Sequence, residues 1–256
     1  MPFTPSHAIV ALPFVRTPLP WGAVAVGSMA PDVPLFFPLG PSYQQTHEFP
    51  SLLVVSVPVG LLLYLIWRRL LRPAMSTLLP RVVASRLPAS WAAGTTGSAR
   101  RLPWVVLTVA LGVGSHVAWD LFTHHGRFGS TLIPALADQW GPIAGTQWLQ
   151  YPSSVGGLAV LAVAAARHLR RTPALAPAPP SRIRTVFWVL VGASLVAGLV
   201  GAVLVHGLLP GSADTAKAFT FVAGTLAGAL ILLLTAAASV VVLLVRRRAA
   251  GRVTTR

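Results

Sequence analysis

The sequence predicts an all-α, multi-pass transmembrane helical bundle with five or six spans and a broken or re-entrant first segment. Three observations predict this fold class: 54% of the 256 residues are hydrophobic, only 10% are charged, and long apolar stretches alternate with basic segments. Such a composition lies outside the range of soluble globular domains and is typical of integral membrane proteins. The lipid bilayer is therefore the expected partner of most of the surface.

The N-terminal part is predicted to be irregular, because prolines interrupt its apolar pieces, 8–15 and 21–37. Proline removes a backbone donor and breaks or kinks a helix, which predicts a broken or re-entrant segment. The first basic residue, Arg16, follows the apolar start instead of preceding it, unlike a signal peptide. We therefore expect the segment to stay in the mature protein.

Five later stretches are predicted to cross the membrane. A hydrocarbon core of about 30 Å needs roughly 20 helical residues at 1.5 Å per residue. The stretches that approach or exceed this length are 51–67, 103–123, 149–166, 185–209 and 219–245. A segment rich in Pro, Ser, Ala and Arg, 73–102, is predicted to be a loop between the first two of them.

Seventeen of the 20 basic residues lie between the spans or after the last one, all on one side of the predicted topology. They are Arg68, Arg69, Arg72, Arg81, Arg86, Arg100, Arg101, Arg167, Arg170, Arg171, Arg182, Arg184, Arg246, Arg247, Arg248, Arg252 and Arg256. By the positive-inside rule this side is cytoplasmic, which predicts a plasma or inner membrane protein with a cytoplasmic C-terminus. The Arg clusters are expected to contact anionic lipid headgroups, so the net charge of +15 does not require a nucleic acid partner.

The chain is predicted to have two functional parts joined by a linker. Residues 1–171 form a membrane-embedded helical domain that carries the polar motifs, and 172–182 form a Pro/Ala-rich cytoplasmic linker. Residues 183–256 form a two-helix transmembrane hairpin with a basic tail. The glycines of this hairpin favour close helix packing and make it a candidate for a helix–helix partner; they are Gly192, Gly198, Gly201, Gly224 and Gly228.

Histidines and carboxylates gather in the first part. The whole chain contains only five carboxylates, and an ionisable group at membrane depth is costly and usually functional. On a helix, His116, Asp120 and His124 are spaced four apart and share one face. The alternative is that Asp120 and a histidine form a hydrogen-bonded pair without metal.

Three further residues are candidates for the same site at the extracytoplasmic ends of the spans. Asp32 emerges from an apolar stretch between two prolines, although it could also be a turn or capping residue. His47 precedes a span and has an interfacial role as its alternative, and His7 is equally ambiguous. The chain has no cysteine, so any metal would have nitrogen and oxygen ligands, as zinc and manganese accept.

The order and spacing of these motifs resemble the family of membrane proteins of unknown function called DUF4184, whose members open with Met-Pro-Phe-Thr-x-Ser-His. This chain has that opening at residues 1–7. It also has Gly-Ser-Met-Ala-Pro-Asp ending at Asp32, Thr-His at 46–47, and Ser-His-x-x-x-Asp-x-x-Thr-His from Ser115. The resemblance covers about residues 1–157 and leaves the C-terminal helical pair uncovered.

More distantly, the motif order is similar to that of the inner-membrane metal-dependent hydrolase family DUF457 and to the zinc-dependent phospholipase C pattern. This similarity implies metal-ligand roles for His7, Asp32, His47, His116 and Asp120. Two positions depart from the hydrolase-like pattern. The chain has Tyr43-Gln44-Gln45-Thr46-His47 where that family has His-Arg-Gly-x-Thr-His, and Pro34 where it has the second acid of Pro-Asp-x-Asp.

These observations predict metal-dependent hydrolysis of a lipid or another membrane-attached ester or phosphoester. Zinc is the expected ion and manganese the alternative. The general base is Glu48, or whichever of Asp32 and Asp120 does not bind the metal. His7 reaches such a site only if the first segment doubles back at its prolines.

Two other classes of function stay open. In a structural or assembly protein the cluster would be a satisfied polar network or a structural metal site. In a transporter or proton relay the same residues would line a pathway across the bilayer.

Overall fold

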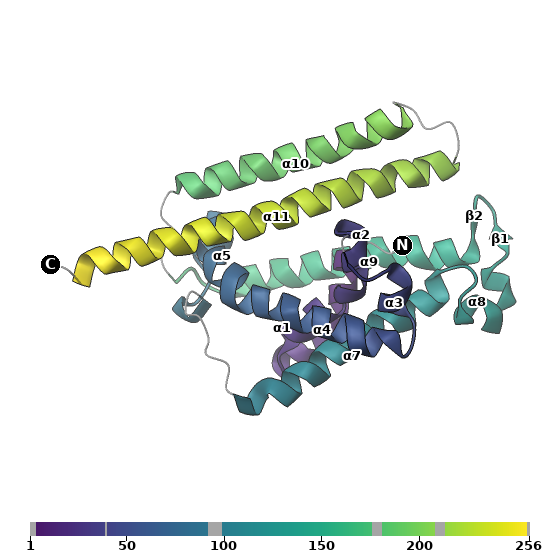
Figure 1. Cartoon of the computed structure of the whole chain (residues 1–256), viewed down its shortest axis with the longest axis horizontal. Coiled ribbons are helices and arrows are strands. Elements are labelled where there is room, and N and C mark those ends of the chain that lie inside the picture. The colour runs from purple at the N-terminus through teal and green to yellow at the C-terminus, as the bar shows by residue number, and fades with distance from the viewer. Residues whose placement is uncertain (1–3, 39, 92–98, 176–180, 208–212, 255–256) are drawn as a thin grey trace. The chain divides into compact units, whose positions relative to one another are not determined.

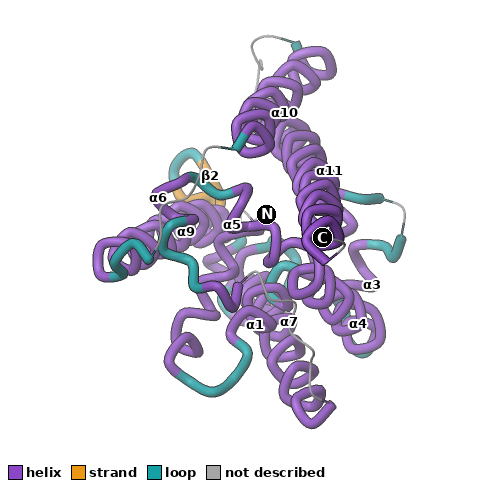
Figure 2. The backbone as a smooth tube through the Cα atoms, turned by 90° about the vertical axis from the view of Figure 1, so that its left-hand side faces the viewer, coloured by secondary structure: helices purple, strands orange, loops and turns teal. Residues whose placement is uncertain are grey.

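The computed structural model describes residues 4–38, 40–91, 99–175, 181–207 and 213–254. Helices account for most of the described chain, as the backbone tube in Figure 2 shows. The strands among these residues are β1 (Gln139–Trp140) and β2 (Ile143–Ala144), which pair antiparallel in a small hairpin. The predicted all-α fold class is confirmed.

Five helical segments are long and apolar enough to cross a membrane, as the sequence predicted. Their bounds are Ser51–Leu78, Leu102–Thr123, Gly145–Arg171, Arg182–His206 and Thr215–Ala250. The first of them extends beyond the predicted span, because α4 (Ser51–Ile66) continues through a π-helical turn, η3 (Trp67–Leu71), into α5 (Arg72–Leu78).

The predicted loop 73–102 is therefore wrong in its first part. Helix α5 lies within it, and so do α6 (Arg81–Ala84) and the short 3₁₀ turns η4 (Ala89–Trp91) and η5 (Ala99–Arg101). Residues 92–98 of that loop lie outside the described chain. Arg and Lys stems can lie along apolar surface while their charged heads reach water, so the arginines near residue 70 do not end the helix.

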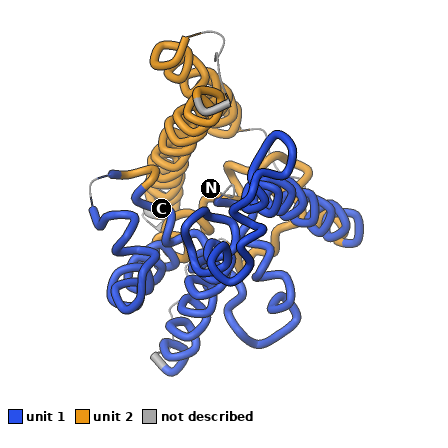
Figure 3. The backbone as a smooth tube through the Cα atoms, turned by 90° about the vertical axis from the view of Figure 1, so that its right-hand side faces the viewer, with its two compact units in different colours: residues 1–34, 38–65, 96–171 blue, residues 35–37, 66–95, 172–256 orange. Residues whose placement is uncertain are grey.

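The chain divides into two compact units, drawn in different colours in Figure 3. Unit 1 comprises residues 1–34, 38–65 and 96–171, and unit 2 comprises 35–37, 66–95 and 172–256. The predicted linker 172–182 contains residues 176–180, which the structure does not describe. That linker and the predicted domain bounds stay predictions.

Unit 1 holds the N-terminal elements and the second and third candidate spans. Its elements are η1 (Thr4–Arg16), α1 (Trp21–Gly27), η2 (Ala30–Asp32), α3 (Tyr43–His47), α4, η5, α7 (Leu102–Thr123), α8 (Phe128–Leu132), η6 (Pro134–Leu136), the β1–β2 hairpin and α9 (Gly145–Arg171). Within this unit η1 packs mainly against α1 and α9 and also contacts α7. A short helix, α2 (Val33–Phe36), follows η2 directly and ends in unit 2.

The first segment is broken as predicted. It is split into η1, α1, η2 and α2, and the chain turns between η1 and α1 where Pro18 and Pro20 lie. Because η1 and α1 then pack against each other, the chain doubles back on itself. This is the arrangement that His7 needs to reach the remaining candidates.

Helices α1 and α7 approach so closely that only glycine fits at two positions. A Cβ on Gly112 would lie 2.3 Å from the carbonyl oxygen of Val24, and one on Gly27 would lie 2.4 Å from that of Val109. The neighbouring core is small and apolar, and its fully buried members are Ala23, Ala30, Val109 and Val113. This contact fixes the position of α7 along α1. The candidate site lies next to the C-terminal end of α1.

In unit 2, α10 (Arg182–His206) and α11 (Ala213–Thr254) run side by side (Figure 1). Gly198 allows this contact, since its Cβ would lie 2.5 Å from the carbonyl oxygen of Ala223. Arg184 and Arg246 donate to backbone carbonyls of α5 and its C-cap Leu79, at distances of 2.7 to 3.3 Å. The basic ends of α10 and α11 therefore both contact α5.

A candidate metal centre in unit 1

The six residues predicted as metal ligands all lie in unit 1, and their contacts join them into one group. We call this group the His/Asp cluster. It consists of His7 on η1, Asp32 on η2, His47 on α3, His116 and Asp120 on α7, and His124 just after α7. The first five are at most 8% exposed.

His116 is at the centre of the cluster and is fully buried. Its Nδ1 lies 2.7 Å from the backbone carbonyl of Ser28. A carbonyl oxygen can only accept, so Nδ1 carries a proton and donates to Ser28, and in the neutral ring Nε2 has the lone pair. That Nε2 lies 3.5 Å from Asp32 Oδ1 and 3.4 Å from Asp120 Oδ2.

His47 is held in the same way from another element. Its Nδ1 lies 2.9 Å from the carbonyl oxygen of Tyr43, one turn earlier in α3, so it too donates to the backbone. Its Nε2 then faces the Nε2 of His116 at 3.3 Å. Fixing the outer nitrogen of an imidazole by a hydrogen bond is how proteins aim the inner nitrogen at a metal.

When both rings are neutral, the two inner imidazole nitrogens and the carboxylate oxygens converge without a hydrogen-bond donor among them. Two imidazole nitrogens with lone pairs and two carboxylate oxygens repel one another unless a cation lies between them. A proton on one imidazole or a metal ion would supply that positive charge. This arrangement is the chemical basis for a metal centre.

The distances between these atoms fit zinc. His47 Nε2, His116 Nε2 and Asp32 Oδ1 form a triangle with sides of 3.3, 3.5 and 3.7 Å. Asp120 Oδ2 in place of the Asp32 atom gives sides of 3.3, 3.4 and 3.7 Å. Ligands around a tetrahedral ion with bonds of about 2.0–2.1 Å are roughly 3.3–3.4 Å apart, so either triangle needs only small shifts to hold one.

Asp32 is oriented by Thr4. The Thr4 hydroxyl donates to Asp32 Oδ2 at 2.6 Å and leaves Oδ1 facing the imidazoles. Burial by itself would raise the pKa of Asp32, but its contacts with His116, His47 and Thr4 outweigh that effect and hold the pKa well below its usual range. Thr4 and His7 lie three residues apart on a 3₁₀ helix with three residues per turn, so both face the cluster.

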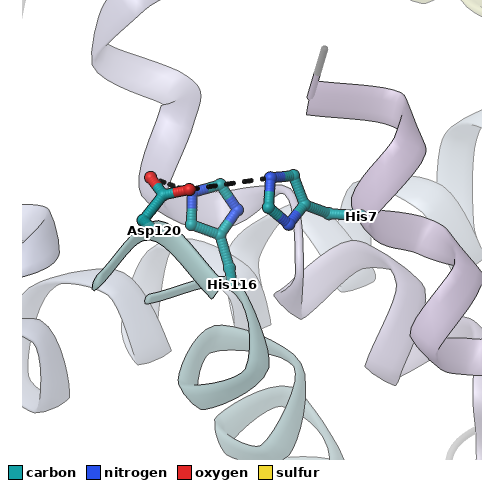
Figure 4. Close-up of side chains that lie close together, drawn as sticks. All are labelled: His7, His116 and Asp120. Carbon is teal, nitrogen blue, oxygen red and sulfur yellow. Dashed lines mark ion pairs between the residues drawn. The ribbon is translucent and has the colours of Figure 1, made fainter. Parts of the chain in front are cut away.

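Asp120 joins His7 to the rest of the cluster. Figure 4 marks ion pairs from its carboxylate to both His116 and His7, and His7 Nε2 lies 3.9 Å from Oδ1. The two imidazole rings stack with centroids 3.9 Å apart. Burial lowers the pKa of His7 to about 4, so the ring is neutral at pH 7 and has a lone pair to offer.

His124 lies at the edge of the cluster, because α7 ends at Thr123 and His124 has extended backbone angles. Its Nδ1 is nevertheless 3.2 Å from the backbone carbonyl of Asp120 and 3.8 Å from Oδ2 of that residue. Burial lowers its pKa. The neighbouring His125 is exposed.

Unpaired buried atoms mark the same place. Four atoms of the cluster have no hydrogen-bond partner among the residues that the structure describes, and they are His7 Nε2, Asp32 Oδ1, Asp120 Oδ1 and His124 Nε2. Buried polar atoms are rarely left unpaired, because each costs about 1–3 kcal/mol. Four in one cluster of imidazoles and carboxylates fit the donor set of zinc or manganese.

Glu48, the predicted base, lies directly after His47 at the end of α3. Its half-exposed carboxylate is 3.6 Å from the guanidinium of Arg127. The ion pair directs Glu48 toward Arg127 in this structure, and its role as the base stays a prediction.

Three residues of the site were missed by sequence reasoning: Thr4, Ser28 and Tyr43. The Tyr43 ring stacks on His47 at 3.7 Å between centroids, and its hydroxyl lies 3.4 Å from Asp120 Oδ2. Burial and the nearby Asp120 raise the pKa of this phenol. Thr4 and Ser28 lie inside the quoted motifs and could have been marked from them, whereas Tyr43 was noted only in the segment that departs from the hydrolase-like pattern.

Comparison with known proteins identifies the family. The model of the family described as "Domain of unknown function (DUF4184)" matches residues 1–240, and the chain belongs to this family. The match runs past residue 157 through α10 and most of α11, so the expectation that the C-terminal pair lies outside the resemblance is wrong. Searches of curated proteins and of solved structures gave no match.

Proposed function

We propose that this member of the DUF4184 family is a membrane-embedded, metal-dependent hydrolase that acts on a lipid or another membrane-attached ester or phosphoester. One observation carries the proposal. The inner nitrogens of His47 and His116 face each other at 3.3 Å, their outer nitrogens are tied to backbone carbonyls, and carboxylates flank them.

In this proposal an ion is bound by Asp32, His47, His116 and Asp120, and His7 and His124 are further metal ligands of the His/Asp cluster. Zinc suits the mixed nitrogen and oxygen donors, and manganese is the alternative. When bound, such an ion lowers the pKa of a coordinated water to about 7 and polarises an ester oxygen. Thr4 and the Ser28 carbonyl orient the ligands.

A carboxylate near the ion takes the proton from the attacking water. Glu48 is the first choice because it is adjacent to His47 and half-exposed, so it can exchange protons with solvent. Full turnover in a Glu48→Gln variant would remove Glu48 from this role and assign it to Asp32 or Asp120.

The proposal places the chain in a plasma or inner membrane with its C-terminus in the cytoplasm. The support is the location of basic groups in unit 2, where Arg184 and Arg246 donate to α5 and its C-cap. Helix ends that carry several arginines favour the cytoplasmic side of the membrane, where they can contact anionic lipid headgroups. The substrates then accessible to the cluster are membrane lipids at the outer interface.

Elemental mass spectrometry of the detergent-purified, tag-free protein tests the metal site. We expect stoichiometric zinc or manganese in the wild type and none in the His116→Ala/Asp120→Ala double variant. His125→Ala is the matched control, because this histidine is adjacent to His124 but exposed, and it should keep the full content. Stoichiometric metal in the wild type would justify screening phosphoester and carboxyl ester lipids.

A second candidate is a metal-free polar network with a structural role. It is favoured by the position of His116 Nε2, which lies within 3.5 Å of both Asp32 and Asp120, so that a protonated ring would neutralise both carboxylates. Well-folded wild-type protein that stays metal-free after incubation with zinc and with manganese would support this candidate and overturn the hydrolase.

A further inference from the structure

His7 and His116 cannot both bind the same ion in the arrangement observed. Their rings are stacked, with an interplanar angle of 26° and centroids 3.9 Å apart. The lone pair of an imidazole nitrogen lies in the plane of its ring, so the lone pairs of stacked rings run side by side instead of converging. An ion about 2.0–2.1 Å from both nitrogens would have to lie between the ring planes, where neither lone pair points.

The carboxylate of Asp120 offers each ring a separate oxygen. His116 Nε2 lies 3.4 Å from Oδ2, while His7 Nε2 lies 3.9 Å from Oδ1 (Figure 4). The other neighbours of the His116 nitrogen, His47 and Asp32, contact it at 3.3 and 3.5 Å. Both His7 Nε2 and Asp120 Oδ1 lack a hydrogen-bond partner among the described residues.

From this geometry we infer that the cluster binds two divalent cations bridged by Asp120. The first is bound by Asp32, His47, His116 and Asp120 Oδ2, and the second by His7 Nε2 and Asp120 Oδ1. Stacked rings place the two positions about one ring spacing apart, which agrees with the roughly 3.5–4 Å of two-metal sites. This inference rests on the metal site of the proposed function and extends it.

The two positions differ in how many ligands the protein supplies. The first is surrounded by four side chains, whereas His7 and Asp120 give the second only two, which leaves coordination positions open to water and substrate. The second cation should therefore be the more weakly bound and the more readily exchanged.

A pair of cations of this spacing points to a phosphoester as the substrate class. Two adjacent ions stabilise the attacking and the leaving oxygen of an in-line displacement at phosphorus. In the hydrolysis, the oxygen of water forms a new P–O bond and the ester P–O bond breaks. One proton of the water passes to the carboxylate base, and the departing oxygen takes up a proton to become an alcohol.

Manganese loading of the purified wild-type protein tests the pair of cations. We expect two manganese ions per chain by elemental analysis at saturating metal, with two separable affinities. The EPR spectrum should show the exchange-coupled signal of two neighbouring Mn²⁺ ions at full loading. These wild-type measurements do not depend on whether any variant folds.

Variants then assign the two positions. His7→Ala should bind one manganese and lose the coupled EPR signal, while His125→Ala should keep two ions and the coupling. A wild-type protein that saturates at one ion, or a folded His7→Ala that still binds two coupled ions, would overturn the inference. If the wild type binds one ion and His116→Ala/Asp120→Ala binds none, the proposed function stands without the second cation. If the folded wild type binds no metal at all, both the two-cation inference and the proposed function are wrong.

Discussion

Arg184 and Arg246 in unit 2 and the His/Asp cluster in unit 1 differ in how their polar atoms are paired. In unit 2, Arg184 donates to carbonyls at the C-terminal end of α5 and its C-cap, which have no partner within the helix. Arg246 donates to the Pro73 carbonyl and to two hydroxyls of α5. In unit 1, imidazoles and carboxylates from four separate elements turn toward one another and leave four atoms unpaired among the described residues. Unpaired buried polar atoms lower stability, so the four in unit 1 make the His/Asp cluster the candidate site for a metal ion.

Glycines support both units, and each unit offers a matched open position. A Cβ added to Gly112 or Gly198 would meet backbone atoms at 2.3 and 2.5 Å, whereas one added to Gly114 or Gly192 on the same helices would meet nothing within 4 Å. Alanine at Gly112 or Gly198 therefore disturbs helix packing, whereas alanine at Gly114 or Gly192 changes only the flexibility of the helix itself.

The largest effect is expected from Gly112→Ala. Its Cβ would meet the carbonyl oxygen of Val24 and the backbone nitrogen of Ser28, so α1 must move away from α7 and carry the Ser28 carbonyl off His116. We expect a destabilisation of about 3 kcal/mol and loss of bound metal, measured by thermal unfolding in detergent and elemental analysis. Gly114→Ala should change neither, and an equal effect of the two substitutions would contradict the packing argument.

The next effect is expected from Thr4→Val. It keeps the shape of the side chain but removes the donor that holds Asp32 Oδ2, so Asp32 Oδ1 is less well aimed. Loss of such a supporting hydrogen bond typically lowers metal affinity by about 10–100-fold, which competition with a chelator would measure. Thr220→Val in unit 2 loses only bonds to its own helix and should leave the affinity unchanged.

Gly198→Ala should act on stability alone. Its Cβ would crowd the backbone of α11 at Ala223 and the side chain of Ala227, which we expect to cost about 1–3 kcal/mol. Metal content should not change, because the His/Asp cluster belongs wholly to unit 1. Reduced metal affinity in this variant, with none in Gly192→Ala, would show that the two units are energetically coupled.

The smallest effect on stability is expected from Glu48→Gln. The carboxylate is 44% exposed and 3.6 Å from Arg127, and an ion pair this exposed contributes less than about 1 kcal/mol. Thermal unfolding should shift little and metal content should stay constant. Lost metal in this variant would mean that Glu48 is a ligand instead of a base.

The sequence by itself determined the fold class, four of the five spans to within a few residues, and the set of residues in the cluster. Composition and the length of the apolar stretches predict the spans, because the thickness of the hydrocarbon core sets how many helical residues are needed to cross it. The cluster residues stood out because ionisable side chains are rare and costly in such a chain. The continuation of the first span to Leu78 was missed, since the Pro- and Arg-rich composition there resembles that of a loop.

Only the tertiary structure decided which atoms meet. Thr4 meets Asp32 across 28 residues, His47 meets His116 across 69, and the Ser28 carbonyl meets His116 across 88. Helical spacing relates His116 to Asp120 because they are one turn apart, but it says nothing about residues on different elements. Those contacts depend on the close approach of α1 to α7 and on the reversal of the chain after η1, because packing of whole helices fixes the positions of their side chains.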